Sequence, residues 1–312
     1  MSMIKNAIST KNNNCSAYAR ISMLHFLQLL INKFGATMTK IENEDHKLVK
    51  TMTDLAVSCV SKTNELEIER IYQTLAYFTA ACLAAGDRSD KELLSQMLIG
   101  VGHPLVGRKV AQSFRILLAP SQVMNEKNFC VIRKLRKQRL YQLTVDKIIG
   151  MWRGTQNKDE KENCLIALAG IFAYMEPNIL EENAATIFPL VLEGTNVQND
   201  DYTMYSYISL IQALVVVCPD VISSHVDSII NRMTDRTHNT YDSPSDASVK
   251  CRTAALDVLA LLVSHMERRV LLRRKAKIMV ELDVALDDCS RTVRSAAERT
   301  KMRWFNLVDA DS

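Results

Sequence analysis

The stretch that decides the fold spans residues 268–305 and reads RRVLLRRKAKIMVELDVALDDCSRTVRSAAERTKMRWF. Apolar residues recur in it at helical spacing as far as Asp288. After a break of about three residues, a second helix is expected to open at Thr292 and to end near Trp304. The stretch therefore predicts two successive helices joined by a tight turn.

The same order of elements occurs one unit earlier in the chain. A helix is expected over 219–236, and a second one opens at 248–250. Val249 and Val293, which occupy matching places in the two units, lie 44 residues apart. A helix pair that recurs at about this spacing is typical of a HEAT-type solenoid, an architecture that binds other molecules.

Two apolar stripes strengthen this prediction. Pro177 and Pro219 differ by 42 positions, and a stripe at i, i+4, i+7 and i+11 follows each of them. The stripes are Leu180, Ala184, Ile187 and Val191, and then Ile222, Val226, Ile229 and Met233. Each helix pair leaves an apolar face that only a neighbouring pair can cover, so the pairs must stack. We expect an all-α HEAT-repeat solenoid of about seven antiparallel helix pairs over 17–307, between a disordered N-terminus (1–16) and a tail (308–312).

Composition agrees with a helical fold, because the 312 residues include few glycines (9) and prolines (6). Net charge is only +4, although residues 268–303 carry a local excess of +6 (eleven Lys and Arg, five Asp and Glu). The eight cysteines stand singly, so we expect free buried thiols, no metal site and no cofactor. No apolar run has membrane-spanning length, and no signal peptide is evident. A cytoplasmic and nuclear protein without a membrane partner is expected.

Several helix ends are expected from glycines and from capping residues. We expect helices at 17–34 (stopped by Gly35), 45–61, 65–85 (stopped by Gly86), 89–100 and 105–119, and one that Asn157 and Glu160 open as a capping box and that reaches Met175.

No catalytic motif is present, and we expect no enzymatic activity. Gly102-His103-Pro104 is interpreted as a turn between stacked helices. The adjacent carboxylates Asp287 and Asp288 favour a solvated helix end over an acid–base pair, which would need side chains converging from separate elements.

A basic run at 133–139 has five cations in seven residues. It could contact nucleic acid or an acidic partner, but a solvated helix face is favoured because no aromatic residues interleave the cations.

The closing helix gives the sharpest site hypothesis. Val293, Ala297, Thr300 and Trp304 share one face and should pack on the preceding helix, with Trp304 as an anchor. The candidate partner-binding residues are Arg291, Arg294, Arg299, Lys301 and Arg303. An equally weighted alternative is a structural ladder in which such cations pair with Asp246 and Asp288 of adjacent repeats.

Three groups of residues resemble one known family. They are 137–141 with 145–148, 177–180 with 187–193, and the ending that comprises 285–288, 292–294, Ala296, Arg299 and 304–305. The chain resembles the C-terminal repeats of the large HEAT-repeat targeting subunit of cytosolic iron–sulfur protein assembly (CIA), also described as a DNA repair and transcription adaptor. Family members are several times longer, so a C-terminal fragment or short isoform is expected.

This resemblance implies a non-enzymatic adaptor. Its C-terminal repeats would dock the complex's WD-repeat propeller and its small cluster-donating subunit. Client apoproteins such as DNA helicases and polymerases would be engaged with the help of upstream repeats, and no direct nucleic-acid contact is implied. Two alternatives remain from other classes: a HEAT-like DNA repair glycosylase, and a generic transport or phosphatase scaffold.

Overall fold

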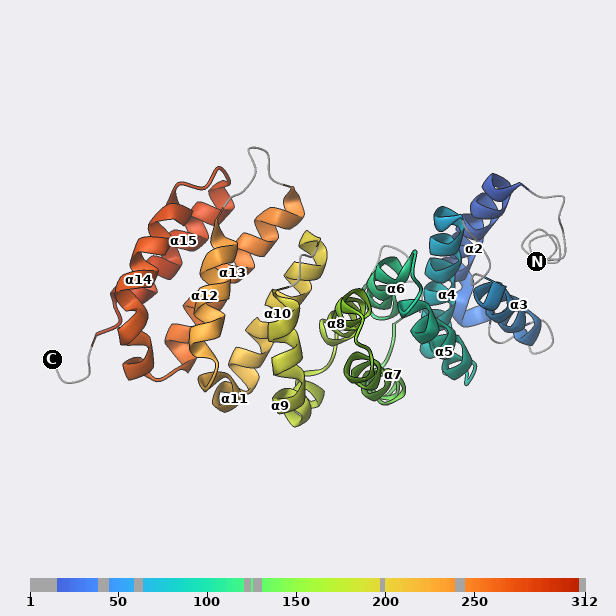
Figure 1. Cartoon of the computed structure of the whole chain (residues 1–312), viewed down its shortest axis with the longest axis horizontal. Coiled ribbons are helices and arrows are strands. Elements are labelled where there is room, and N and C mark those ends of the chain that lie inside the picture. Colours follow the sequence, from blue (N-terminus) through green and yellow to red (C-terminus); the bar gives the residue numbers. More distant parts are fainter. Residues whose placement is uncertain are drawn as a thin grey trace. The chain divides into compact units, whose positions relative to one another are not determined.

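The computed structural model describes residues 16–38, 45–58, 64–120, 125, 131–196, 200–238 and 245–308. Within these ranges the regular structure is entirely helical, and no strand occurs. The chain divides into two compact units, Met1–Glu176 and Pro177–Ser312 (Figure 1). The all-α repeat architecture predicted from the sequence is confirmed. The expected disorder of residues 1–15 and the expected tail at 309–312 lie outside the described residues.

The N-terminal unit is built from seven α-helices and one 3₁₀ turn in its described residues. They are α2 (Ala17–Met38), α3 (Asp45–Ser58), α4 (Glu65–Ala85), α5 (Asp90–Val101), α6 (Gly107–Ser113), η2 (Phe114–Leu117), α7 (Lys134–Gly154) and α8 (Lys158–Phe172). Helix α4 packs against α2, α3, α5 and α6, while α8 packs against α6 and α7. Helix α4 is therefore the centre of the first half of this unit, and α8 of the second.

Two predicted helix ends in this unit have different outcomes. Gly86 ends α4 as predicted: it adopts φ +83°, and its N–H donates to the carbonyl of Cys82. Gly35 does not end α2, which continues to Met38. A glycine stops a helix when it takes the left-handed conformation, whereas α2 runs through position 35 without a break.

The predicted capping box at the start of α8 is wrong in its second half. Asn157 caps the helix by accepting the N–H of Asp159 at 3.0 Å. Glu160 does not return a bond to the N–H of Asn157, because the hydroxyl of Thr155 takes that place at 3.2 Å and also donates to Glu160 at 2.5 Å. Thr155 and Asn157 therefore form this cap together, and α8 ends at Phe172 rather than Met175.

Within its described residues, the C-terminal unit consists of three stacked helix pairs. Its helices are α9 (Pro177–Gly194), α10 (Asp201–Val217), α11 (Pro219–Ser223), α12 (Val226–Thr237), α13 (Asp246–His265), α14 (Arg268–Leu286) and α15 (Arg291–Phe305). Helices α10, α13 and α15 pack side by side as one layer, and α9, α12 and α14 lie against them as the other (Figure 1). The boundaries of α14 and α15 agree with the prediction.

One predicted helix of this unit is broken in two. The helix expected over 219–236 is interrupted at Ser224 and His225, which separate the short α11 from α12. The predicted stripe survives the break, since Ile222, Val226, Ile229 and Met233 are all buried. Its counterpart on α9 (Leu180, Ala184, Ile187 and Val191) is buried as well. Burial of the apolar stripe thus continues across a change in backbone direction.

None of the described helices is long and apolar enough to cross a bilayer.

Candidate functional site

The buried face of α15 is the one predicted. Val293, Ala297, Thr300 and Trp304 are all at most 1% exposed. The hydroxyl of Thr300 donates to the carbonyl of Leu256, and Nε1 of Trp304 donates to that of Leu259 at 3.0 Å. Both carbonyls belong to α13, so α15 is fixed on α13 as well as on the preceding α14. Trp304 is the packing anchor that the sequence predicted.

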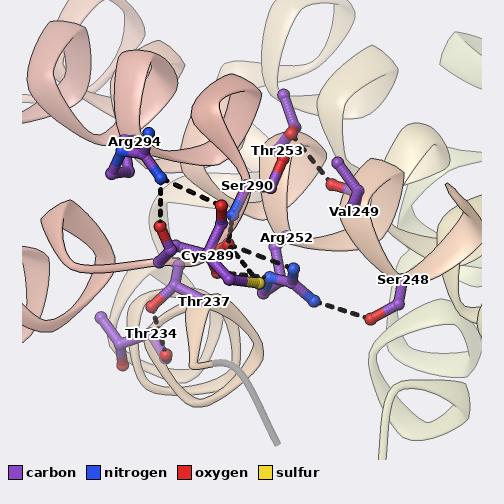
Figure 2. A network of polar contacts seen from close by, with 10 residues as sticks. Thr234, Thr237, Ser248, Val249, Arg252, Thr253, Cys289, Ser290 and Arg294 are labelled. Carbon is purple, nitrogen blue, oxygen red and sulfur yellow. Dashed lines mark hydrogen bonds and ion pairs between the residues drawn. The ribbon is translucent and has the colours of Figure 1, made fainter. Parts of the chain in front are cut away.

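The five candidate cations of α15 do not form one surface, because the buried face divides them. On the flank next to α14, Lys301 pairs with Asp283. On the same flank, Arg294 donates to the carbonyl oxygens of Asp288 (2.7 Å) and Cys289 (3.0 Å), as Figure 2 shows. Arg294 therefore closes the turn between α14 and α15, which is a structural role.

Arg299 and Arg303 lie on the opposite flank, next to α13. Both approach Asp257, whose pKa is raised by burial and lowered in part by these two guanidinium groups. Arg303 also donates weakly to the carbonyl of Ala260 at 3.4 Å. The fifth candidate, Arg291, is exposed at the start of α15. Arg291, Arg299 and Arg303 are consequently the candidates best placed to meet another molecule.

The turn between α14 and α15 contains a buried ion pair that the sequence did not assign. Arg252 of α13 donates from Nε and Nη2 to the two carboxylate oxygens of Asp288, at 2.7 and 3.3 Å. Its Nη1 donates to Ser248 on the same helix (Figure 2). Asp288 is therefore not the solvated helix end that we predicted. Asp288 does pair with a cation, but this cation is Arg252 of α13 and not one of the α15 cations that the ladder alternative named. Asp246, the other ladder candidate, pairs within its own helix with Lys250.

The basic run at 133–139 is used inside the N-terminal unit. Lys134 and Lys137 both lie within ion-pair distance of Glu176, and they lower its pKa. Arg139 holds Asp90, which is nearly fully buried at the start of α5, through two bonds of 2.7 and 2.8 Å. Three of the five cations thus join elements of one unit, so the run is neither a merely solvated face nor a free nucleic-acid contact.

A second group of cations, which sequence reasoning did not select, lies on α14. Arg268, Arg269 and Arg273 occupy its first two turns and are exposed. The local excess of positive charge at 268–303 pointed to this helix, but the resemblance drew attention to α15 instead. These exposed residues extend the positive charge of the last repeat pair from α15 to α14.

The remaining candidates for chemistry have structural roles or none. Gly102-His103-Pro104 is a turn between α5 and α6, as predicted, and Nδ1 of His103 accepts the N–H of Leu105. Free thiols are buried at Cys82, Cys164, Cys218 and Cys251, whereas Cys289 is exposed, contrary to the expectation. Burial raises the pKa of Cys164 and of Cys251 to about 12. In the part of the chain that the structure describes, no cluster of His, Cys, Asp and Glu could hold a metal ion.

The fold and the stacked pairs define a helical-repeat protein of the HEAT and armadillo class. An engineered protein of known structure matches 97% of this chain and 68% of its own, with a TM-score of 0.54 and 11% identity. A designed armadillo repeat protein matches 81% of this chain and 99% of its own, with a TM-score of 0.50 and 10% identity. These similarities establish the fold.

The particular family follows from the sequence itself. Residues 1–263 match the family model MMS19_C, described as "RNAPII transcription regulator C-terminal", and the chain belongs to this family. The family expected from the resemblance is thereby confirmed.

The relatives of this chain include proteins from animals, a fungus, a plant and an amoeba. The "MMS19 nucleotide excision repair protein homolog" of Xenopus tropicalis is 24% identical over 98% of this chain and 28% of its own length. The human homologue of the same name is 27% identical over 69% of this chain and 20% of its own. The "DNA repair/transcription protein mms19" of Schizosaccharomyces pombe is 23% identical over 92% of this chain and 27% of its own length. The chain thus spans about a quarter of the length of these relatives.

Proposed function

We propose that this chain is the C-terminal part of a non-enzymatic adaptor for cytosolic iron–sulfur protein assembly, acting in the cytoplasm and nucleus. The adaptor would link assembly factors to apoprotein targets of DNA metabolism and repair, such as helicases and polymerases. Membership of the MMS19_C family is the observation that supports this proposal most strongly. The names of the relatives, which refer to nucleotide excision repair and to DNA repair and transcription, agree with such targets.

The stacked repeats are suited to binding, because each pair presents side chains along an extended surface. Docking of the WD-repeat propeller and the small cluster-donating subunit is assigned to the last repeat. Among its candidate residues, Arg291 and Arg299 can be changed with the least effect on the fold. Arg291 is exposed. Within the described part of the chain, Arg299 makes a 3.2 Å contact with Ser295 and lies near Asp257. Arg294 and Lys301 are less suitable, since their internal contacts would be lost too.

The test uses purified propeller and small subunit, mixed with the full chain and measured by size-exclusion chromatography and calorimetry. Arg291→Glu combined with Arg299→Glu should weaken the complex about tenfold or more at physiological salt, because reversed charges repel a complementary surface. Lys91→Glu combined with Lys147→Glu is the matched control, since both lysines are exposed in the N-terminal unit and the change in net charge is the same.

Circular dichroism should show unchanged helicity in both variants. Unchanged affinity of the Arg291 and Arg299 variant would remove this site from the proposal. Absence of any complex with the two wild-type subunits would contradict the docking role itself. Release of a base from alkylated duplex DNA by the chain would favour a glycosylase instead.

A further inference from the structure

The outer face of α14 carries a continuous stripe of exposed side chains. Arg269, Arg273 and Lys277 follow one another at i, i+4 and i+8, and all three are exposed. They lie opposite the face that packs into the unit, where Leu271, Ile278, Leu282 and Ala285 are at most 1% exposed. The first half of the outer face is therefore a row of cations.

The second half of the same face is apolar. Val280 and Val284 continue the stripe, and they are 68% and 53% exposed. Residues 269, 273, 277, 280 and 284 are spaced by three or four positions, which places them on one side of a helix. Such spacing is suited to packing against a second helix laid along the first.

The stripe itself contains no acidic residue, and four other charged side chains of α14 have partners within the unit. Arg274 holds Asp227 of α12, at 2.7 Å from Nε, and lowers its pKa. Lys275 donates to the carbonyl oxygens of Phe305 and Leu307 at the end of α15.

The two acidic side chains of α14 also have partners within the unit. Glu281 lies 3.2 Å from Nε2 of His238, and Asp283 pairs with Lys301. Two members of the stripe also interact within the unit. Lys277 donates a 3.1 Å bond to the amide oxygen of Asn231, and Arg273 lies close enough to Asp227 to contribute to the lowering of its pKa.

The two cations at the start of α14 are unfavourable for their own helix. Arg268 and Arg269 stand in the first turn of α14, where the helix dipole favours acidic side chains, and this turn contains none. Glu267, at the N-cap, makes no side-chain capping bond. Because this arrangement is unfavourable for an isolated helix, the positive charge is better explained by recognition of a negatively charged partner.

We propose that the outer face of α14 docks an amphipathic helix of a partner protein. Carboxylates at one end of that helix pair with Arg269, Arg273 and Lys277, and apolar side chains at its other end cover Val280 and Val284. This proposal goes beyond the assignment of the last repeat to iron–sulfur assembly, because it concerns a different helix face and a partner defined by its charge pattern.

The pattern fits such a helix better than nucleic acid or a membrane. A nucleic acid would be followed by cations along the whole groove, with stacking aromatic residues, whereas this stripe turns apolar halfway and contains none. A membrane-binding face inserts large apolar or aromatic side chains, and two valines supply little area. A helix with both carboxylates and apolar anchors matches both halves.

The test measures fluorescence anisotropy of a labelled helical peptide of about 18 residues, constrained by a side-chain staple, against the full chain at physiological salt. On one face the peptide carries three glutamates and then two leucines at the spacing of the stripe. We expect saturable binding that Arg269→Glu with Arg273→Glu weakens about tenfold or more. Val280→Ser with Val284→Ser should weaken it by a smaller factor of about three to ten. Lys91→Glu with Lys147→Glu is the control for net charge, and a peptide with lysines in place of the glutamates should not bind.

Three results would overturn the proposal. Equal binding of an unstructured polyglutamate of the same charge would show electrostatic attraction without a docking face. Insensitivity to both stripe variants would place the peptide elsewhere. Tighter binding of duplex DNA or of anionic phosphatidylserine vesicles, abolished by the same arginine reversals, would assign the face to one of those partners instead.

Discussion

Arg252 and Asp288 form a two-bond ion pair in which the side chains are only 3% and 1% exposed. The pair joins α13, the middle helix of its layer, to the turn that precedes α15. Asp288 also accepts the N–H of Ser290 at 2.7 Å, next to the start of α15. One carboxylate thus fixes both the position of the turn and the beginning of the last helix.

Removing the carboxylate should destabilise the C-terminal unit strongly. Asp288→Ala leaves the guanidinium of Arg252 buried without its counter-charge, which costs about 3–5 kcal/mol in the free energy of unfolding. Urea unfolding followed by circular dichroism measures this loss. Asp246→Ala is the control, because Asp246 is exposed in its pair with Lys250 and should cost less than about 1 kcal/mol. Equal effects of the two substitutions would show that burial of the Arg252 pair contributes nothing to the free energy of unfolding.

The double replacement Arg252→Met with Asp288→Leu tests whether apolar side chains can take the place of this ion pair. Apolar side chains of similar size often replace a buried ion pair with little loss, since no charge remains to be desolvated. The double variant should therefore be closer to wild type than Asp288→Ala is. Stability below that of the single variant would mean that the turn depends on the hydrogen bonds themselves.

The helices were largely predictable because their signals are local. The apolar residues from Leu180 to Val191 recur at helical spacing, which indicates that one face of the helix is buried. Val293 and Trp304 are spaced in the same way. The ion pair of Arg252 with Asp288 was not predictable in this way, because its members lie 36 positions apart and meet only after three helices have packed. The break at His225 was missed for a related reason: the apolar periodicity continues across it.

The candidate site shows the same limit. Counting charge located the basic end of the chain, but Arg294 and Arg303, which belong to the same helix, have different roles. Arg294 closes a turn through main-chain carbonyls, whereas Arg303 approaches Asp257. Periodicity indicates which face of a helix is buried, yet it does not indicate which backbone carbonyl or acid lies within reach of an exposed arginine.

Trp304 offers a second stability prediction. Trp304→Ala removes a fully buried ring and leaves a cavity, which should cost about 3–5 kcal/mol. Trp304→Phe retains most of the apolar contact but leaves the carbonyl of Leu259 without its Nε1 donor, so a smaller loss of about 1–3 kcal/mol is expected. Denaturant unfolding of both variants measures the difference, and similar losses would imply that the ring fills little of the space between α13 and α15.

Two glycines of the N-terminal unit should respond in opposite directions to the same substitution. Gly150, in α7, has open space where a Cβ would lie, so Gly150→Ala should stabilise by about 0.5–1 kcal/mol through helix propensity. A Cβ on Gly170, in α8, would come 2.8 Å from the backbone nitrogen of Arg115. Gly170→Ala should therefore destabilise, since backbone cannot move aside as a flexible side chain can. Thermal unfolding of the pair checks both signs, and a stabilising Gly170→Ala would contradict the close packing of α8 on η2.

Asp257 makes the C-terminal unit sensitive to pH. Burial raises the pKa of its carboxyl group, so between the unfolded and folded pKa values the folded state binds more protons than the unfolded state. The contribution of this group to the free energy of unfolding therefore falls as the pH rises through that window. At neutral pH, ionised Asp257 lowers the stability of the folded state. Asp257→Asn should raise Tm at pH 7 by about 1–2 °C. The advantage should shrink towards zero as the pH is lowered to about 4, where the wild-type carboxyl group is increasingly protonated in both states.

The control for this pH effect is Asp283→Asn, which removes the exposed pair with Lys301 and should leave Tm within about 1 °C at either pH. Differential scanning fluorimetry at matched ionic strength measures all three proteins. Attraction to Arg299 and Arg303 opposes the cost of burial at Asp257. A Tm for Asp257→Asn below that of the wild type at pH 7 would therefore mean that the two arginines outweigh desolvation, and that the carboxylate stabilises the contact between α13 and α15.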